Sequence, residues 1–379
     1  MCGIAGIIGK ERTDKRKVAQ AMVDIITHRG PDEDGFFHDE MLSMGMRRLS
    51  IIDLSTGQQP ISNEDDSKII IFNGEIYNFQ PLREDLISKG HIFKTHGDTE
   101  VLLHLYEEFG EDMLPKLRGM FVFAIYDKTA KSLFVARDYF GIKPLYYRVE
   151  DSGKIVGFGS EIKSLLCDPK YKPIVNDEAV FNYLSFQYNP LEETMFKGIY
   201  SLPPASSLTI DLVDGVGEIK KYWDYTFQPS REKNGQTIEE SLKKEVLEKM
   251  RDTVKAHMIS DVPVGAFLSG GIDSAVIVTL MDEISRANGY KDGKVKTFTI
   301  GFAEVSEHSE AKIVADRLQT DHHEITVSFD KEKDDEFFGK VQTYRKEVKI
   351  LIPVTAGADS FTLKGTSQGC WDGGICYPP

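Results

Sequence analysis

The chain has 379 residues, a formal net charge of −14 at pH 7 and 41% hydrophobic residues. Its length favours two domains over one, and its negative charge argues against nucleic acid or an anionic membrane as a partner. No apolar run approaches the roughly 20 residues that a membrane helix requires. The four cysteines, Cys2, Cys167, Cys370 and Cys376, are too scattered to predict a disulfide framework or a zinc site. We therefore expect a cytoplasmic protein that acts on small molecules.

The first 225 residues or so alternate strand-like and helix-like segments. Segments at 81–90 and 98–117 carry apolar residues at helical spacing. The strand-like segments combine β-branched and aromatic residues with Gly, Asn or Asp at their ends; they are GIAGIIG (3–9), SKIIIFNGEIYNF (67–79), GMFVFAIYD (119–127), SLFVARD (132–138) and KIVGFGSE (154–161). This mixture predicts an α+β sandwich.

A polar segment rich in Pro, Gly and charge then predicts a linker, after which the periodicity changes. Residues 237–258 have apolar side chains four apart, which predicts a helix. The following segments predict alternating strands and helices of a parallel α/β sheet; they are 262–284 (strand, glycine loop, helix), 294–302 (strand), 311–319 (helix) and 322–329 (strand). From about residue 334 the chain shows no clear periodicity.

Cys2 has the chemistry of an N-terminal nucleophile. The small residue Gly3 after it is compatible with removal of Met1, which would leave a thiol and a free α-amine on one residue. Reference pKa values of about 7.7–8.0 for the amine and about 8.5 for the thiol let the amine accept the thiol proton near neutral pH. Most cysteines near a terminus have no such role, so Cys2 alone leaves a structural role open.

Five motifs, the first of which contains Cys2, appear in order along the chain: CGIAGI (2–7), HRGPD (28–32), RRLSIID (47–53), NGEIYN (73–78) and HGDTE (96–100). Together with RDYFGIKPLYY (137–147) and GFGSEIKSL (157–165), they resemble the class II glutamine amidotransferase domain, an N-terminal nucleophile hydrolase. The resemblance covers residues 2 to about 215. It implies a sandwich of two antiparallel sheets between helices.

The resemblance also implies how glutamine is attacked. Cys2 would attack the side-chain carboxamide of glutamine and form a thioester. Asn73 and Gly74 would donate side-chain and backbone N–H groups to the developing oxyanion, a contribution of roughly 3–4 kcal/mol per donor in acyl-transfer enzymes. The alternative for the Asn73–Gly74 pair is an ordinary turn.

Recognition of the substrate would involve three charged residues. Arg48 would pair with the α-carboxylate of glutamine, to which a planar guanidinium is suited. Glu75 and Asp98 would hold the α-amino group. Taken singly, Arg48 and Asp98 are equally compatible with ordinary surface charges, and the ordered set of motifs favours the functional interpretation.

The string SGGIDS lies between an apolar strand and a helix, where backbone N–H groups and the helix dipole suit a phosphate. It lacks the lysine of a Walker A loop, which argues against kinase or GTPase chemistry. It resembles the pyrophosphate-binding loop of the ATP pyrophosphatase family, in which Asp273 would support the loop or a Mg²⁺ ion. The expected ATP-site residues are Leu268, Ser269, Gly270, Gly271, Asp273, Ser274 and Gly301.

The two domains in this order resemble glutamine-hydrolysing asparagine synthetases. The resemblance implies that ammonia from glutamine attacks a β-aspartyl-AMP made from aspartate and ATP, with release of AMP and pyrophosphate. It also allows a homodimer. The related β-lactam synthetases lack the N-terminal cysteine. The expected divisions are an amidotransferase domain (2–215), a linker (216–236), a partial ATP-binding domain (237–333) and an unassigned tail (334–379).

The printed sequence departs from that family beyond residue 333, because a second nucleotide motif of the type SGEGxDELFGGY is absent from it. We therefore expect an incomplete parallel-sheet domain and glutaminase activity alone. The alternative is a non-catalytic remnant that binds glutamine or a full-length partner subunit.

Overall fold

The structure is a computed structural model. It describes residues 2–227, 235–287, 294–302 and 307–327, and the backbone of strands 331–335, 339–343, 348–351 and 362–365. The chain divides into two compact units, residues 1–231 and 232–379. No helix within these described ranges has both the length and the apolar character needed to cross a membrane.

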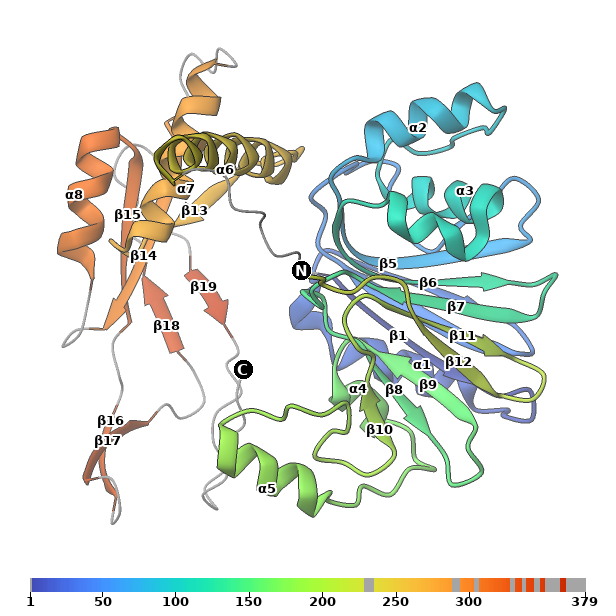
Figure 1. The fold of residues 1–379 in the computed structure, drawn as a ribbon. Helices are drawn as coiled ribbons and strands as arrows, with labels where there is room; N and C mark the ends of the chain where they lie inside the picture. The colour runs from blue at the N-terminus through green and yellow to red at the C-terminus, as the bar shows by residue number, and fades with distance from the viewer. Residues whose placement is uncertain are drawn as a thin grey trace. The chain divides into compact units, whose positions relative to one another are not determined.

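Two six-stranded sheets form the first unit (Figure 1). The first contains β1 (Gly3–Ile8), β2 (Glu33–His38), β3 (Leu42–Arg48), β8 (Tyr146–Val149), β9 (Ile155–Gly159) and β10 (Ile199–Ser201), in the order β10-β8-β9-β1-β3-β2. The second contains β4 (Ile61–Ser62), β5 (Lys68–Ile76), β6 (Gly119–Asp127), β7 (Ser132–Arg137), β11 (Ser206–Asp211) and β12 (Gly217–Lys221), in the order β12-β11-β7-β6-β5-β4. All of these pairings are antiparallel.

The strand that follows Cys2 is buried on both faces. Ile4 belongs to the apolar cluster that also contains Ile71 from β5, so this side of β1 packs between the sheets. Ala5 and Ile7 belong to a second cluster with residues of helix α1 (Lys15–Asp24). Because both faces are covered, the sequence of β1 is continuously apolar and does not alternate.

Helices cover the outer faces of the two sheets (Figure 1). α1 and α4 (Ile162–Leu166) pack on the first sheet, and α2 (Phe79–Ser88) and α3 (Thr99–Phe109) lie over the second. Smaller elements are the 3₁₀ turns η1 (Thr27–Arg29) and η2 (Gly110–Lys116) and the helix α5 (Asp177–Phe186). The arrangement confirms the predicted sandwich.

The helical segment expected over residues 98–117 is shorter than predicted. α3 ends at Phe109 because Gly110 adopts φ +54°, a left-handed conformation that interrupts an α-helix. The 3₁₀ turn η2, which contains Pro115, follows directly. The apolar spacing continued through this break, so the periodicity alone did not reveal it.

The second unit contains a parallel three-stranded sheet in the order β13-β14-β15, as predicted for an α/β domain. Its strands are β13 (Gly265–Phe267), β14 (Lys296–Phe302) and β15 (Asp321–Val327), and its helices are α6 (Gly235–His257), α7 (Ile272–Ala287) and α8 (His308–Leu318). Two antiparallel pairs follow, formed by β16 (Lys331–Asp335) with β17 (Gly339–Thr343) and by β18 (Val348–Leu351) with β19 (Thr362–Gly365).

The expected linker and tail correspond only partly to described residues. Gly217–Lys221, near the start of the expected linker, forms β12 and pairs with β11. Residues 228–234 of the linker and most of the segment 334–379 lie outside the described residues. The domain limits therefore stay predictions.

Candidate active site

Cys2 is half-buried and lies directly ahead of β1. The backbone N–H of Leu49 donates a hydrogen bond to Cys2 Sγ over 3.3 Å. The Arg29 Nε–H group donates to the Cys2 carbonyl oxygen over 2.9 Å, and Arg29 Nη1 pairs with Glu161 over 3.1 Å. Three separate motifs of the sequence thus meet around the cysteine and fix its position.

Burial raises the pKa of the Cys2 thiol, and the hydrogen bond from the Leu49 N–H opposes that rise. A thiol with a raised pKa is largely neutral near pH 7, so it requires a base before it can attack a carbonyl carbon. The α-amine that removal of Met1 would expose is a base on the same residue. Met1 itself lies outside the described residues.

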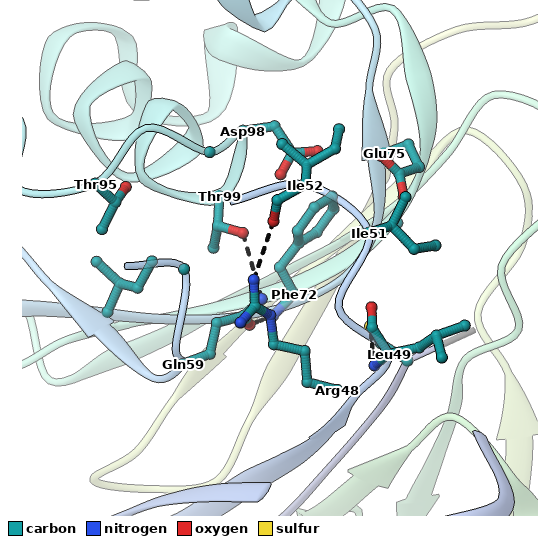
Figure 2. A pocket seen from close by; sticks show the side chains of 15 residues that line it. Arg48, Leu49, Ile51, Ile52, Gln59, Phe72, Glu75, Thr95, Asp98 and Thr99 are labelled. Carbon is teal, nitrogen blue, oxygen red and sulfur yellow. Dashed lines mark hydrogen bonds between the residues drawn. The ribbon is translucent and has the colours of Figure 1, made fainter. Parts of the chain in front are cut away.

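One pocket brings together five of the six residues predicted for the glutaminase site: Cys2, Arg48, Gly74, Glu75 and Asp98. Figure 2 shows Arg48, Glu75 and Asp98 among its side chains, with Leu49 close to Arg48. Apolar side chains complete the lining; they are Ile51, Ile52, Ile61 and Phe72. These residues come from strands, loops and a helix start that are far apart in the sequence.

Asn73, the sixth predicted residue, is not among the pocket-lining residues, although its neighbour Gly74 is. Asn73 is 1% exposed, and neither its Nδ2 nor its Oδ1 atom has a hydrogen-bond partner in the described part of the chain. A buried amide without partners costs free energy, which makes this side chain unusual in a folded protein. Gly74 packs so closely that a Cβ would lie 2.2 Å from the Met120 carbonyl oxygen.

Arg48 is held by several acceptors. Its Nη1 atom lies 2.9 Å from the carboxylate of Glu33, and its Nη2 donates to the carbonyl oxygens of Ile52 and Asp53 over 3.0 and 2.7 Å. Arginine has five N–H donors, so Nε and the second Nη1 hydrogen stay available to a ligand within the described contacts. The guanidinium is therefore fixed in one orientation in the pocket that Cys2 also lines.

Glu75, which is half-buried, and Asp98, which is buried, are neighbouring carboxyl groups in this pocket. Burial, with the neighbouring charge of Asp98, raises the pKa of Glu75 to about 8. Burial also raises the pKa of Asp98 to about 6, opposed by a 2.9 Å hydrogen bond from the Ile76 N–H to Asp98 Oδ2. Two carboxyl groups that share a buried site cannot both ionise freely, so the pair favours a cationic ligand.

The residues that hold this pocket in shape had no individual role in the sequence analysis. The carboxylate of Asp53 accepts hydrogen bonds from the N–H groups of His96 and Gly97 over 2.8 and 3.1 Å, which fixes the turn before Asp98. Glu33 orients Arg48, and Leu49 contacts the thiol. Most of these residues lie inside the quoted motifs, and that position is the signal that could have revealed them.

The SGGIDS loop joins β13 to α7 in the second unit. Ser269 and Ser274 are linked by a 3.0 Å hydrogen bond between their Oγ atoms, and the Ser269 N–H donates to Ser274 Oγ over 3.2 Å. Gly270 has φ +71°, and a Cβ there would lie 2.5 Å from the Cβ of Glu310. The loop therefore requires glycine at this position.

The other predicted ATP-site residues surround the same strand ends. The Leu268 N–H donates to the Phe298 carbonyl oxygen over 2.8 Å, which ties the loop to β14. Gly271 directly precedes α7, and Asp273 lies in its first turn. Gly301 lies near the end of β14, opposite Thr326 of β15. Loops at the carboxyl ends of parallel strands are the usual ligand sites of such sheets.

A two-sheet sandwich whose central strand starts immediately after a cysteine is the architecture of the N-terminal nucleophile hydrolases. The family model described as "Glutamine amidotransferase domain" matches residues 1–223, more than half of the chain. The chain belongs to this glutamine amidotransferase family. A second model, described as "Asparagine synthase", matches residues 245–347 and so continues past residue 333.

The names of two relatives from Bacillus subtilis combine asparagine synthesis with glutamine hydrolysis. Glutamine-hydrolyzing asparagine synthetase 1 is 43% identical over 334 residues, which cover 86% of this chain and 50% of that protein. Glutamine-hydrolyzing asparagine synthetase 3 is 33% identical over 347 residues, which cover 86% of this chain and 54% of that protein. The chain thus spans about half the length of these relatives.

Proposed function

We propose that the first unit hydrolyses glutamine at Cys2 and supplies ammonia for the synthesis of asparagine. The observation that carries the proposal is the pocket itself, in which Cys2 lies together with Arg48, Glu75 and Asp98. A nucleophile, a cation for a carboxylate and two acidic groups for an ammonium group match the three ends of a glutamine molecule.

The reaction starts when the α-amine of Cys2 accepts the thiol proton and the thiolate attacks the side-chain carboxamide carbon of glutamine. The resulting oxyanion accepts hydrogen bonds from the Gly74 backbone N–H and from Asn73 Nδ2. The carbon–nitrogen bond then breaks, and the protonated amine returns its proton to the departing nitrogen, so that ammonia leaves and a thioester stays on Cys2. Water cleaves the thioester and releases glutamate.

Arg48 and the Glu75–Asp98 pair position the substrate for this attack. The free N–H groups of Arg48 bind the α-carboxylate, and its anchoring by Glu33 and the backbone carbonyls means that little side-chain entropy is lost on binding. Glu75 and Asp98 bind the α-ammonium group. This arrangement selects a free amino acid.

The second unit would use the ammonia. The match to the asparagine synthase model and the SGGIDS loop support binding of ATP, with phosphates at the start of α7. Mg²⁺ is commonly held by one or two carboxylates together with nucleotide phosphates, and Asp273 at this helix start offers one. Aspartate would be adenylated there and would accept the ammonia. The expectation of glutaminase activity alone and of a homodimer both stay predictions.

The test is an assay of the purified chain with glutamine, aspartate, ATP and Mg²⁺. We expect ammonia and glutamate to appear in equal amounts from glutamine alone. Asparagine and AMP are measured in the same samples, because they report the synthetase reaction separately. Absence of glutamine turnover would overturn the glutaminase proposal, and glutamine turnover without asparagine would restrict the function to the first unit.

The affinity for glutamine should rise with pH between about 6 and 8. In this range the Glu75–Asp98 pair still holds a proton, since its pKa values are raised to about 8 and about 6, and an ammonium ligand binds the doubly ionised pair better. Loss of that one proton allows a rise of up to about tenfold per pH unit. The measurement is calorimetric titration of a non-hydrolysing Cys2→Ala variant at several pH values. Glu75→Gln should flatten the dependence, and an unchanged slope would contradict the assignment.

A further inference from the structure

A cluster of imidazole and carboxylate groups lies away from the Cys2 pocket, where the start of the α2–α3 connection meets α3. His104 Nδ1 lies 2.7 Å from Glu107 Oε2 and 4.0 Å from Glu64 Oε2. His91 Nδ1 lies 3.6 Å from the same Glu107 oxygen. Glu64, His91 and His104 can each place one ligand atom within 4.8 Å of the others. Glu107 adds a carboxylate oxygen beside the two histidines.

These separations suit a tetrahedral metal ion. Ligand atoms that surround a Zn²⁺ ion at about 2.0–2.2 Å lie about 3.3–3.6 Å from one another. The separations in the cluster fall on either side of this range, so small side-chain movements are sufficient to form the site. Two imidazoles and two carboxylates are a donor set that divalent zinc accepts, and the two carboxylates balance its charge.

Each of the four side chains also has a second partner that would orient it. His91 Nε2 lies 3.0 Å from Glu108 Oε1, and His104 Nε2 lies 3.7 Å from Glu100 Oε1. The Asn63 amide donates to Glu107 Oε1 over 2.7 Å, and the Ile92 N–H donates to Glu64 Oε1 over 3.2 Å. Metal-bound histidines usually donate their other ring N–H to a carboxylate or carbonyl, as this arrangement permits.

His104 is the most deeply buried member of this cluster. Its side chain is fully buried, and its Nδ1 atom is the nitrogen that faces Glu64 and Glu107. A histidine in that position costs free energy unless a charge or a metal ion fixes it. We propose that Glu64, His91, His104 and Glu107 form a binding site for a divalent transition metal ion, with Zn²⁺ as its best match.

A proton is the competing occupant. Burial lowers the pKa of His104, but the nearby carboxylates of Glu100 and Glu107 outweigh that effect and raise the pKa to about 9. A cationic imidazole among carboxylates would account for the short contact between His104 and Glu107. Metal binding must displace this proton.

The experiment is titration of the chelator-treated full chain with Zn²⁺ and with Co²⁺, whose visible absorption reports tetrahedral coordination. We expect one ion per chain, the tetrahedral Co²⁺ absorption, proton release on binding and a metal-dependent rise in Tm. His91→Gln and Glu64→Gln should each lower the affinity at least tenfold. Both side chains reach solvent, so these variants should keep the fold, whereas His104 is left unchanged because it is fully buried.

Glu84→Gln, at an exposed position on α2, is the control and should bind the metal as the unaltered chain does. Glu64→Gln should also retain the rate of ammonia release, because it lies outside the Cys2 pocket. Failure to bind either ion stoichiometrically would overturn the proposal and leave a protonated ion-pair cluster. Binding that survives in both ligand variants would overturn it as well, since the metal would then occupy another place.

Discussion

Replacement of Cys2 by alanine should abolish the release of ammonia from glutamine, a loss of about 10⁴-fold or more in kcat. The reaction would lose its nucleophile, and no other described cysteine lines the pocket. Cys2→Ser should also be strongly impaired, because a hydroxyl is a much weaker nucleophile than a thiol near neutral pH. The measurement is steady-state ammonia release. The intact mass of the protein is measured as well, and it should be lower than the mass of the full sequence by one methionine residue.

Cys167 provides the matched control. It is a second half-buried free cysteine, and its Sγ atom lies against the carbonyl oxygens of Ala21 and Lys163 on the outer side of the first sheet. Cys167→Ala should keep the full rate. Turnover that persists in Cys2→Ala, or an equal loss in Cys167→Ala, would show that Cys2 is not the nucleophile.

Asn73→Ala should lower kcat for glutamine by roughly 10²–10³-fold and change KM little, as expected when a donor to an oxyanion is removed. The unfolding free energy should fall by less than about 1 kcal/mol, because the Asn73 amide has no hydrogen bond to lose within the described structure. Steady-state kinetics and denaturant titration of the same sample separate the two effects.

Asn63→Ala is the converse variant. The Asn63 amide donates to Ser67 Oγ and to Glu107 Oε1, and its oxygen accepts from the Lys68 N–H. Its loss should lower the unfolding free energy by about 1–3 kcal/mol and leave kcat unchanged. If Asn73→Ala instead destabilises the protein without affecting kcat, the Asn73 amide has a structural role and the oxyanion assignment is wrong.

The alternating and continuous apolar patterns were sufficient to predict the strands that build the site. β1, β5, β6, β7 and β9 all lie within the expected segments, because a strand of a sandwich core must be apolar on at least one face. The end of α3 was not predicted, because apolar spacing does not encode a local conformation such as the positive φ of Gly110.

Sequence analysis predicted only those residues of the candidate site that lie within the motifs. One pocket of the structure contains five residues that lie within these motifs, as the resemblance implied; they are Cys2, Arg48, Gly74, Glu75 and Asp98. The contacts that tune these groups depend on packing between distant segments. Sequence spacing cannot predict that Leu49, 47 positions away, donates to the thiol, nor that burial raises the pKa of Glu75 to about 8.

The attachment of Cys2 to β1 has a practical side for protein engineering. β1 lies between β3 and β9, and its pairing with β3 already begins at Gly3, opposite Arg47. Because the next residue is already paired in the sheet, Cys2 cannot shift to make room for residues ahead of it. An affinity tag fused ahead of Cys2 would convert its amine into an amide and direct extra chain past the substrate. Recombinant versions need their tag at the carboxyl end, or a cleavable leader that ends at Cys2.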